Sequence, residues 1–330
     1  MLISMINVLN KLWLAFKKLV RGLTKNILQR NPEIEYKVST ISERIDDMLY
    51  KISSKNYEYM NGFPYPRKVN LLRSKLCTES DFHQRWFRHW RKLLGYKSTQ
   101  LHRKIWEYAT IAQALYERNM LEPGKKGLGF GVGTEPLPSL FASRHCHVLA
   151  TDIGPDTEGG KLWVQSKQHL FCTGDLIKNN LFDAASCRKY VSYQQVDMRN
   201  IPESLRDFDF TWSSCAFEHL GSIQNGINFI VNQMSCLKEG GWAVHTTEFN
   251  LTSNERTLEG KDLVFFRRSD IEHLIELLNQ KGYFVEELDT SVGLTKSDYF
   301  VDVPPYSHSP HLKLRMGNYV ITSIILIIRK

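Results

Sequence analysis

The stretch Gly127-Leu-Gly-Phe-Gly-Val-Gly-Thr-Glu-Pro136 has the composition of a turn between a buried strand and a helix. Glycine tolerates positive φ and lets the backbone approach a ligand closely. A proline in the first turn is typical of a helix start. Tight structural turns share this composition, so the stretch is weak evidence alone. Its meaning depends on the segments that follow.

A second apolar run, Val148–Asp152, ends in an acid that lies 21 positions after Gly131 and 19 after Gly133. At this spacing a carboxylate at the end of the second strand of an α/β sheet reaches ribose hydroxyls. Asp197 follows a third run in the same way, and Glu218-His219 follows a fourth. These residues would meet at the carboxyl ends of the strands, where open α/β sheets bind ligands.

From residue 127 onward, short apolar runs alternate with helical patterns, which predicts a doubly wound α/β sheet. The expected strands are Gly127–Val132, Val148–Asp152, Ser192–Val196, Phe208–Ser213, Gly241–Glu248, Phe284–Asp289 and Tyr319–Arg329. Residues 79–120 carry apolar stripes at helical spacing and are predicted to be helical. The domain prediction is a helical N-terminal extension over 1–60, a linker and helical cap over 61–120, and the α/β domain over 121–330.

Over roughly residues 100–330, this series resembles the class I S-adenosylmethionine-dependent methyltransferases, especially the ubiquinone/menaquinone methyltransferase-like branch. The resemblance implies a Rossmann-like sheet of seven strands with an antiparallel last strand, and S-adenosyl-L-methionine as cofactor. It assigns cofactor binding to Gly131, Gly133, Asp152, Asp197 and Met198, and we expect Gly129, Glu135, Ile153 and Ser214 to belong to the same site. The string Phe130–Pro138 is also similar to methyltransferases of bacterial surface-polysaccharide gene sets, which implies a role in polysaccharide synthesis.

Two residues depart from the family pattern: the family usually has an acid at the position of Gly129 and a glycine at that of Glu135. We expect Glu135 to compensate, since a carboxylate is favoured at a helix N-terminus and can pair with the ammonium of the cofactor. A nicotinamide dehydrogenase is a competing interpretation, but Pro136 stands where its G-x-G-x-x-G motif needs the third glycine. A cofactor-binding or scaffold protein without turnover is a further alternative.

The expected reaction is methyl transfer to a hydroxyl of a small polar or glycan substrate, and a hydroxyl acceptor needs a base. The candidate catalytic residues are His219, Glu248 and His308. Candidate substrate-binding residues are Trp106, Tyr108, Glu218, His245, Tyr306 and His311. His245 lies within an expected strand, where a hydrogen-bonded core histidine is the competing interpretation. His308 and His311 have no acidic cluster beside them, so no metal is expected.

The basic charge of the chain is concentrated at the N-terminus. The formal net charge is +8, yet residues 1–30 hold six basic residues and no acid, which leaves +2 for the rest. The nearly neutral body does not indicate a nucleic-acid partner. Apolar residues at spacings of three and four indicate a basic amphipathic helix. Such a helix binds an anionic membrane surface or packs on a partner subunit.

Residues 34–52 carry an apolar heptad pattern of about three repeats. This pattern predicts a homo-oligomer through a short coiled coil, with a helix lying on the α/β domain as the alternative. The six cysteines form no C-x-x-C pair, so neither a zinc ribbon nor a redox dithiol is indicated. Reduced thiols favour a cytoplasmic protein, with the N-terminal helix at the inner face of the cell membrane.

Overall fold

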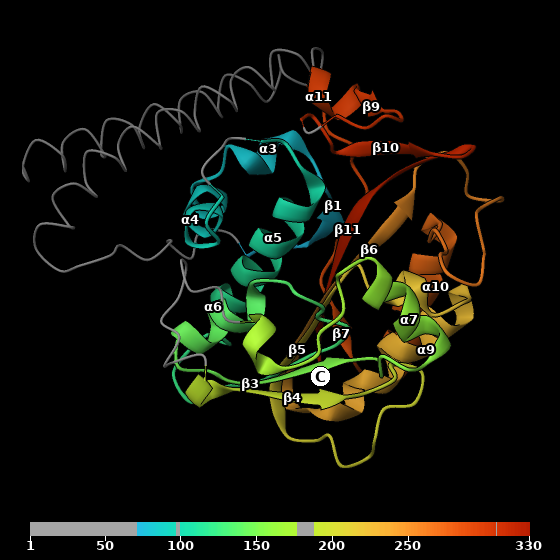
Figure 1. The fold of residues 1–330 in the computed structure, drawn as a ribbon. Helices are drawn as coiled ribbons and strands as arrows, with labels where there is room; N and C mark the ends of the chain where they lie inside the picture. Colours follow the sequence, from blue (N-terminus) through green and yellow to red (C-terminus); the bar gives the residue numbers. More distant parts are fainter. Residues whose placement is uncertain (1–70, 97–99, 177–187, 308) are drawn as a thin grey trace, which may run out of the picture.

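A computed structural model describes residues 71–96, 100–176, 188–307 and 309–330. The predicted N-terminal helix, the heptad segment and His308 therefore lie outside the described residues. A twisted mixed sheet forms the middle of the molecule, with helices on both faces (Figure 1). Its strands are β1 Ser74–Leu76, β2 Lys126–Gly129, β3 His147–Asp152, β4 Val191–Gln195, β5 Phe208–Ser214, β6 Leu237–Asn250, β7 Phe284–Val285, β8 Leu288–Asp289, β9 Val301–Asp302, β10 Lys313–Met316 and β11 Tyr319–Arg329.

The order of the main strands is β4-β3-β2-β5-β6-β11-β1-β8. Strands β2 to β6 pair in parallel, and β11 pairs antiparallel with both β6 and β1. The chain runs from β2 outward to β3 and β4, then returns to the other side of β2 with β5. This reversal is the switch point at which open α/β sheets bind ligands. The predicted doubly wound, Rossmann-like sheet with an antiparallel last strand is confirmed.

The sheet is larger than the seven strands that were expected, because the described residues form eleven. Strands β1, β9 and β10 were not predicted, since runs of two to four residues show no clear periodicity. The expected strand Phe284–Asp289 divides in two: β7 pairs with β11, whereas β8 pairs with β1. The expected strand Gly241–Glu248 begins earlier, at Leu237 in β6, and a register irregularity follows, where Gly240 takes a φ of +75°.

Helices cover the two faces of the sheet and enclose separate apolar cores. The helices are α3 Glu79–Phe82, α4 Arg85–Leu93, α5 Arg103–Glu117, α6 Leu137–Ser143, α7 Glu158–Gln165, α9 Ile223–Gln233, α10 Arg268–Gln280 and α11 Lys296–Tyr299, with short 3-10 turns η2 Thr173–Leu176, η3 Phe217–His219 and η4 Met234–Cys236. Helices α4, α5 and α6 pack around Trp90, Trp106 and Trp212. Helices α9 and α10 pack on the opposite core, around Phe217 and Phe229. The helices predicted within 79–120 are confirmed as α3, α4 and α5, and they share a core with the sheet.

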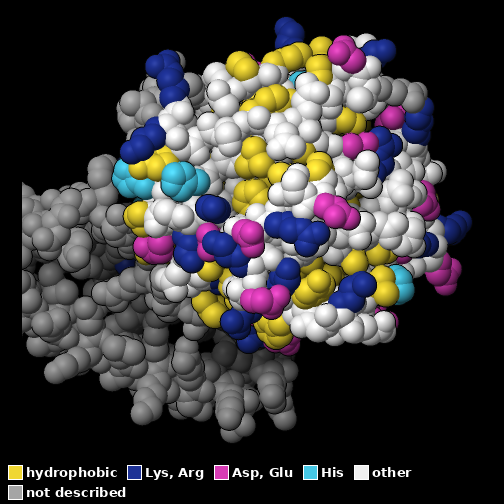
Figure 2. Space-filling view, turned by 90° about the horizontal axis from the view of Figure 1, so that it is seen from below, with side chains coloured by type: hydrophobic (Ala, Val, Ile, Leu, Met, Phe, Trp, Pro, Cys, Tyr) yellow, Lys and Arg dark blue, Asp and Glu magenta, His cyan; other side chains and the backbone are white. Residues whose placement is uncertain are grey.

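Figure 2 shows basic and acidic side chains interspersed over the face seen from below in Figure 1, with apolar groups between them. Charge on this face is therefore mixed rather than gathered into an area of one sign. None of the helices in the described ranges has the length and apolar character needed to cross a membrane.

Candidate functional site

A cavity of about 1230 Å³ opens at the carboxyl ends of the parallel strands. Its walls come from the turn after β2, the end of β3, residues 196–199 after β4, residues 214–216 after β5, and Glu248 near the end of β6. Pockets for a single small molecule usually measure about 300–1,000 Å³. This cavity is large enough for two ligands that meet inside it.

The glycine turn after β2 requires a left-handed backbone at two positions. Gly131 has a φ of +56° and Gly133 a φ of +49°, values that side-chain-bearing residues rarely adopt. A Cβ atom on Gly133 would also lie 2.5 Å from the carbonyl oxygen of Gln168. Both glycines, which the sequence predicts to lie near the cofactor, line the cavity. Gly129 instead lies within β2, away from the cavity lining.

Asp152 ends β3 as a buried carboxylate at the cavity wall. Its Oδ1 accepts a hydrogen bond from the backbone N–H of Ile153 at 2.9 Å, and its Oδ2 accepts one from Leu170 at 3.0 Å. Burial raises the pKa of Asp152 above its ordinary value. Each carboxylate oxygen has room for a second donor, so the fixed carboxylate can still accept hydrogen bonds from a ligand.

Residues at or just after the ends of β3, β4 and β5 complete this half of the cavity. Ile153, Asp197, Met198 and Ser214 all line it. Arg199 donates to Asp197, with the Nη2 and Oδ2 atoms 2.7 Å apart, and this interaction lowers the pKa of Asp197. The structure therefore gathers eight of the nine predicted cofactor residues around one space, with Gly129 as the exception.

The two departures from the family pattern are linked through Trp212. A Cβ atom on Gly129 would lie 2.4 Å from the ring of Trp212, so the indole fills the place where a side chain at residue 129 would begin. The indole N–H of Trp212 donates to Oε1 of Glu135 at 2.7 Å. Burial raises the pKa of Glu135 to about 8. An acid is thus present beside the glycine turn, but it is carried by residue 135.

A charged cluster from α5, buried except for the partly exposed Lys104, lies beside the cavity. Nη1 of Arg103 lies 3.2 Å from Oε1 of Glu107, and Nζ of Lys104 lies 2.9 Å from Oε2 of Glu107. Arg103 also pairs with Glu248, and Oγ of Ser214 donates to Glu107 at 3.2 Å. Burial alone would raise the pKa of Glu107, but Lys104 and Arg103 outweigh it and lower that pKa to about 2. Lys104 and Glu248 line the cavity itself.

Sequence reasoning missed Arg103 and Lys104 as part of the site. The i,i+4 spacing of Arg103 and Glu107 is visible in the sequence and predicts a helical ion pair. Nothing in that spacing indicates that the pair is buried or that it reaches Glu248, which lies 145 positions from Arg103.

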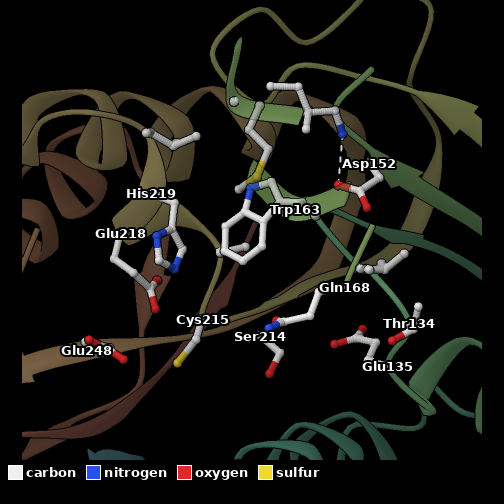
Figure 3. A pocket seen from close by; sticks show the side chains of 18 of the residues that line it. Thr134, Glu135, Asp152, Trp163, Gln168, Ser214, Cys215, Glu218, His219 and Glu248 are labelled. Carbon is white, nitrogen blue, oxygen red and sulfur yellow. Dashed lines mark hydrogen bonds between the residues drawn. The ribbon is translucent and has the colours of Figure 1, made fainter. Parts of the chain in front are cut away.

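His219 lies in η3, and its side chain lines the cavity beside Trp163 (Figure 3). The two rings meet edge to face with centroids 4.7 Å apart. Nδ1 of His219 lies 2.7 Å from the carbonyl oxygen of Asp262. A carbonyl only accepts, so Nδ1 carries the hydrogen. In the neutral ring, Nε2 then holds the lone pair that a base needs.

Two predicted substrate residues belong to the core. The indole N–H of Trp106 donates to Oδ2 of Asp81 at 2.8 Å, and the ring is buried under the sheet. Nδ1 of His245 lies 2.8 Å from Oγ of Ser213, and burial lowers the pKa of His245 to about 3. Neither residue lines the cavity. Tyr108, in contrast, lines it, and burial raises the pKa of its hydroxyl.

Tyr306 and His311 are likewise placed away from the cavity. The hydroxyl of Tyr306 donates to the carbonyl of Arg315 at 2.9 Å, and Nδ1 of His311 lies 2.6 Å from Oδ2 of Asp302. Strand β10 holds this segment beside β11, at a distance from the glycine turn (Figure 1). None of the described residues between 290 and 317 lines the cavity. Across the described ranges, no cluster of three or more His, Cys, Asp or Glu side chains has an arrangement suited to a metal ion.

The comparisons with known proteins find similarity among solved structures. No family model and no curated protein matches the chain. Among solved structures, the methyltransferase domain of the bacterial CtHen1 protein is similar with 15% identity and a TM-score of 0.40, covering 67% of this chain and 96% of that one.

Two further structures give similar values. An S-adenosylmethionine-dependent methyltransferase from Mesorhizobium loti has 12% identity and a TM-score of 0.38, covering 66% of this chain and 96% of that one. The DhpI–SAM–HEP complex has 14% identity and a TM-score of 0.38, covering 67% and 86%. Likenesses of this size identify neither a substrate nor a reaction. The sheet order and the cavity lining carry the assignment instead: the chain has a doubly wound, Rossmann-like α/β fold with its ligand cavity at the switch point.

Proposed function

We propose that this protein is an S-adenosyl-L-methionine-dependent methyltransferase that methylates a hydroxyl of a small polar or glycan substrate, in the synthesis of a bacterial surface polysaccharide. The observation that carries the proposal is the convergence of Asp152, the glycine turn and His219 on one cavity at the switch point. The part of the cavity around Asp152 and the glycine turn would hold the cofactor, and the adjacent part around His219 would hold the acceptor. Methyl transfer requires the two to be positioned next to each other in this way.

The residues present fit this cofactor. Asp152 is a fixed acceptor for ribose hydroxyls, and Ile153 and Met198 offer apolar contacts for the adenine. Glu135 is a buried acid for the amino group of the methionyl part. When bound, the cofactor supplies an electrophilic methyl group on a sulfonium.

His219 has the role of base in this proposal. Because its Nδ1–H is held by the carbonyl of Asp262, its Nε2 can take the proton of the acceptor hydroxyl. The cofactor, which Asp152, Glu135 and Met198 would hold, would supply the methyl group to that oxygen. Glu218, Glu248 and Tyr108 line the same cavity and are assigned to the acceptor. Trp106, His245, Tyr306 and His311 have no place in this mechanism.

A binding experiment tests the cofactor assignment. The full chain is titrated calorimetrically with S-adenosylhomocysteine and, separately, with NAD. S-adenosylhomocysteine should bind, and Asp152→Ala should weaken that binding by roughly 10–100-fold, because hydrogen bonds to a charged acceptor contribute about 1.5–3 kcal/mol. Glu276→Ala, a change at an exposed acid on α10, is the matched control and should bind normally. Binding of NAD without binding of S-adenosylhomocysteine would overturn the proposal in favour of a dehydrogenase.

We also propose that residues 1–30 hold the enzyme at the anionic inner face of the cell membrane, and that residues 34–52 make it a homo-oligomer. The support is the sequence: six basic residues lie mostly between the residues of an apolar stripe, and a heptad pattern follows. Each basic residue near an anionic surface contributes about 1 kcal/mol, and an oligomer multiplies weak contacts. Co-sedimentation with anionic vesicles should retain the full chain but not a chain starting at residue 31. Equal pelleting of the two chains would favour packing on a partner subunit.

A further inference from the structure

Two carboxyl groups on the acceptor side of the cavity each present an oxygen without a partner. Glu218, in η3, is 0% exposed, and Glu248, near the end of β6, is 6% exposed. Both line the cavity, and Figure 3 shows their carboxyl groups on the same side of it, beside His219 and Cys215. Within the described part of the chain, Oε1 of Glu218 and Oε2 of Glu248 have no hydrogen-bond partner.

The other oxygen of each group is held in place by the protein. Oε2 of Glu218 accepts a hydrogen bond from Oγ1 of Thr247 at 2.9 Å. Oε1 of Glu248 accepts one from Nη2 of Arg103. Each carboxyl group is therefore oriented by one oxygen, while its other oxygen is buried without a partner. A buried polar atom without a partner costs about 1–3 kcal/mol, so a fixed pair of such atoms at a cavity wall points to a ligand that satisfies both.

The charges around the pair indicate what kind of ligand this is. Arg103 and Lys104 are balanced by Glu107 and Glu248, through the ion pairs described above. Glu218 is the fifth ionisable group of this cluster. None of the ion pairs found among the described residues includes it. Burial raises the pKa of Glu218; His219 and Lys104 oppose that rise, and the neighbouring Glu248 adds to it. The balanced state of the cluster thus has Glu218 as a neutral carboxylic acid beside the carboxylate of Glu248.

A carboxylic acid next to a carboxylate offers one donor and further acceptors. Hydroxyl groups both donate and accept, so two neighbouring hydroxyls match this pair without adding charge. An ammonium group donates only and would require Glu218 to release its proton. Burying an additional unbalanced charge is costly, which favours a neutral ligand.

We infer that Glu218 and Glu248 bind two neighbouring hydroxyl groups of a neutral, polyhydroxylated acceptor and hold it beside His219. This inference rests on the proposed function and names its substrate class. Glu218 acts as the donor of the pair, and Glu248 acts as the acceptor fixed by Arg103. Both are positioning residues, and the proton of the methylated hydroxyl goes to His219.

The experiment measures the binding of neutral sugars to the full chain in the presence of saturating S-adenosylhomocysteine. The probes are the methyl glycosides of glucose, galactose and mannose, each with a counterpart in which one hydroxyl is replaced by an ammonium group. Calorimetry should find a neutral glycoside that binds at least roughly tenfold more tightly than its ammonium counterpart, the size expected for one mismatched buried hydrogen bond.

Variants separate the two carboxyl groups. Glu218→Gln keeps a donor and an acceptor at this position and should bind the glycoside within roughly threefold of the unchanged protein, whereas Glu218→Ala should lose roughly tenfold or more. Glu248→Gln should also lose roughly tenfold or more. Glu276→Gln, at an exposed position of α10, is the control and should change nothing. The affinity for S-adenosylhomocysteine should stay the same in every variant, which shows that the protein is folded.

Three results would overturn the inference: tighter binding of the ammonium counterparts, equal loss in Glu218→Gln and Glu218→Ala, or no binding of any neutral glycoside while S-adenosylhomocysteine still binds. A protein that does not bind S-adenosylhomocysteine at all contradicts the proposed function instead. The two failures are therefore distinguishable.

Discussion

Replacing Glu135 by glutamine should remove a pH dependence of cofactor binding that the structure builds into the glycine turn. Burial raises the pKa of this carboxyl to about 8, while Trp212 holds one of its oxygens. In the proposed complex, the ammonium group of the cofactor pairs with Glu135 in its ionised form. The protein must then release a proton when the ligand binds below pH 8.

The magnitude follows from that pKa. Roughly one-tenth of the Glu135 carboxyls are ionised at pH 7 and roughly one-hundredth at pH 6. If the ligand binds the ionised form, affinity falls by the same factors, which is about 1.4 kcal/mol for each pH unit. Binding of S-adenosylhomocysteine should therefore strengthen roughly tenfold from pH 6 to pH 7 and level off above pH 8.

Isothermal titration at pH 6, 7 and 8 measures this dependence, and buffers with different ionisation enthalpies count the released protons. Glu135→Gln should bind more weakly at pH 8 and show little change with pH. Asp152→Asn is the matched comparison, since burial also raises the pKa of Asp152, and it should retain the proton release that belongs to Glu135. An unchanged slope in Glu135→Gln would refute the assignment of that residue to the ammonium group.

Three further predictions concern other buried groups. His219→Ala should lower turnover by roughly 10²–10⁴-fold with S-adenosylhomocysteine affinity intact, measured by transfer of labelled methyl; normal turnover would exclude it as the base. Burial lowers the pKa of His245 from an ordinary 6.5 to about 3. Between these two pH values the unfolded chain binds more protons than the folded protein. Acidification should therefore lower the free energy of unfolding by up to about 1.4 kcal/mol per pH unit. Denaturant unfolding between pH 7 and 5 should show a smaller loss in His245→Asn, in which the amide can still pair with Ser213. Glu107→Gln leaves Arg103 with one buried anionic partner fewer and should lower the free energy of unfolding by about 3–5 kcal/mol; a urea midpoint equal to that of the unchanged protein would contradict this.

The part of the fold that sequence predicts well consists of local units. The glycine turn and Asp152 belong to one βαβ unit, so a spacing of about twenty residues is enough to relate them. Strand β11 is predictable because a long apolar run bounded by polar residues indicates a buried strand. The structure places this strand antiparallel to β6. The short strand β1 is not predictable, since three residues carry no periodicity. Its place in the sheet is decided by its pairing with β11, 250 positions away.

The acceptor side of the site is hard to predict for the same reason, because its contacts join residues that are far apart in the sequence. Arg103 and Glu248 form a contact between α5 and β6 that no local pattern contains. The segment of Tyr306 and His311 has the aromatic and polar composition of a pocket loop. Its strand β10 pairs with β11, and that pairing holds the segment away from the cavity. Composition predicts the kind of residue a pocket needs, whereas long-range pairing decides where such residues lie.

The position of β11 has a consequence for how the protein is made. This strand lies between β6 and β1, yet it follows every other strand of the sheet in the chain. During vectorial synthesis β1 leaves the ribosome early but cannot pair with β11 until β11 has been made. Strands β1 and β6 therefore cannot be joined into one sheet until translation has passed residue 329. Pairings of such large sequence separation form slowly, and unpaired strand edges promote aggregation. Ribosome-bound chains that stop before β11 should therefore need chaperone protection.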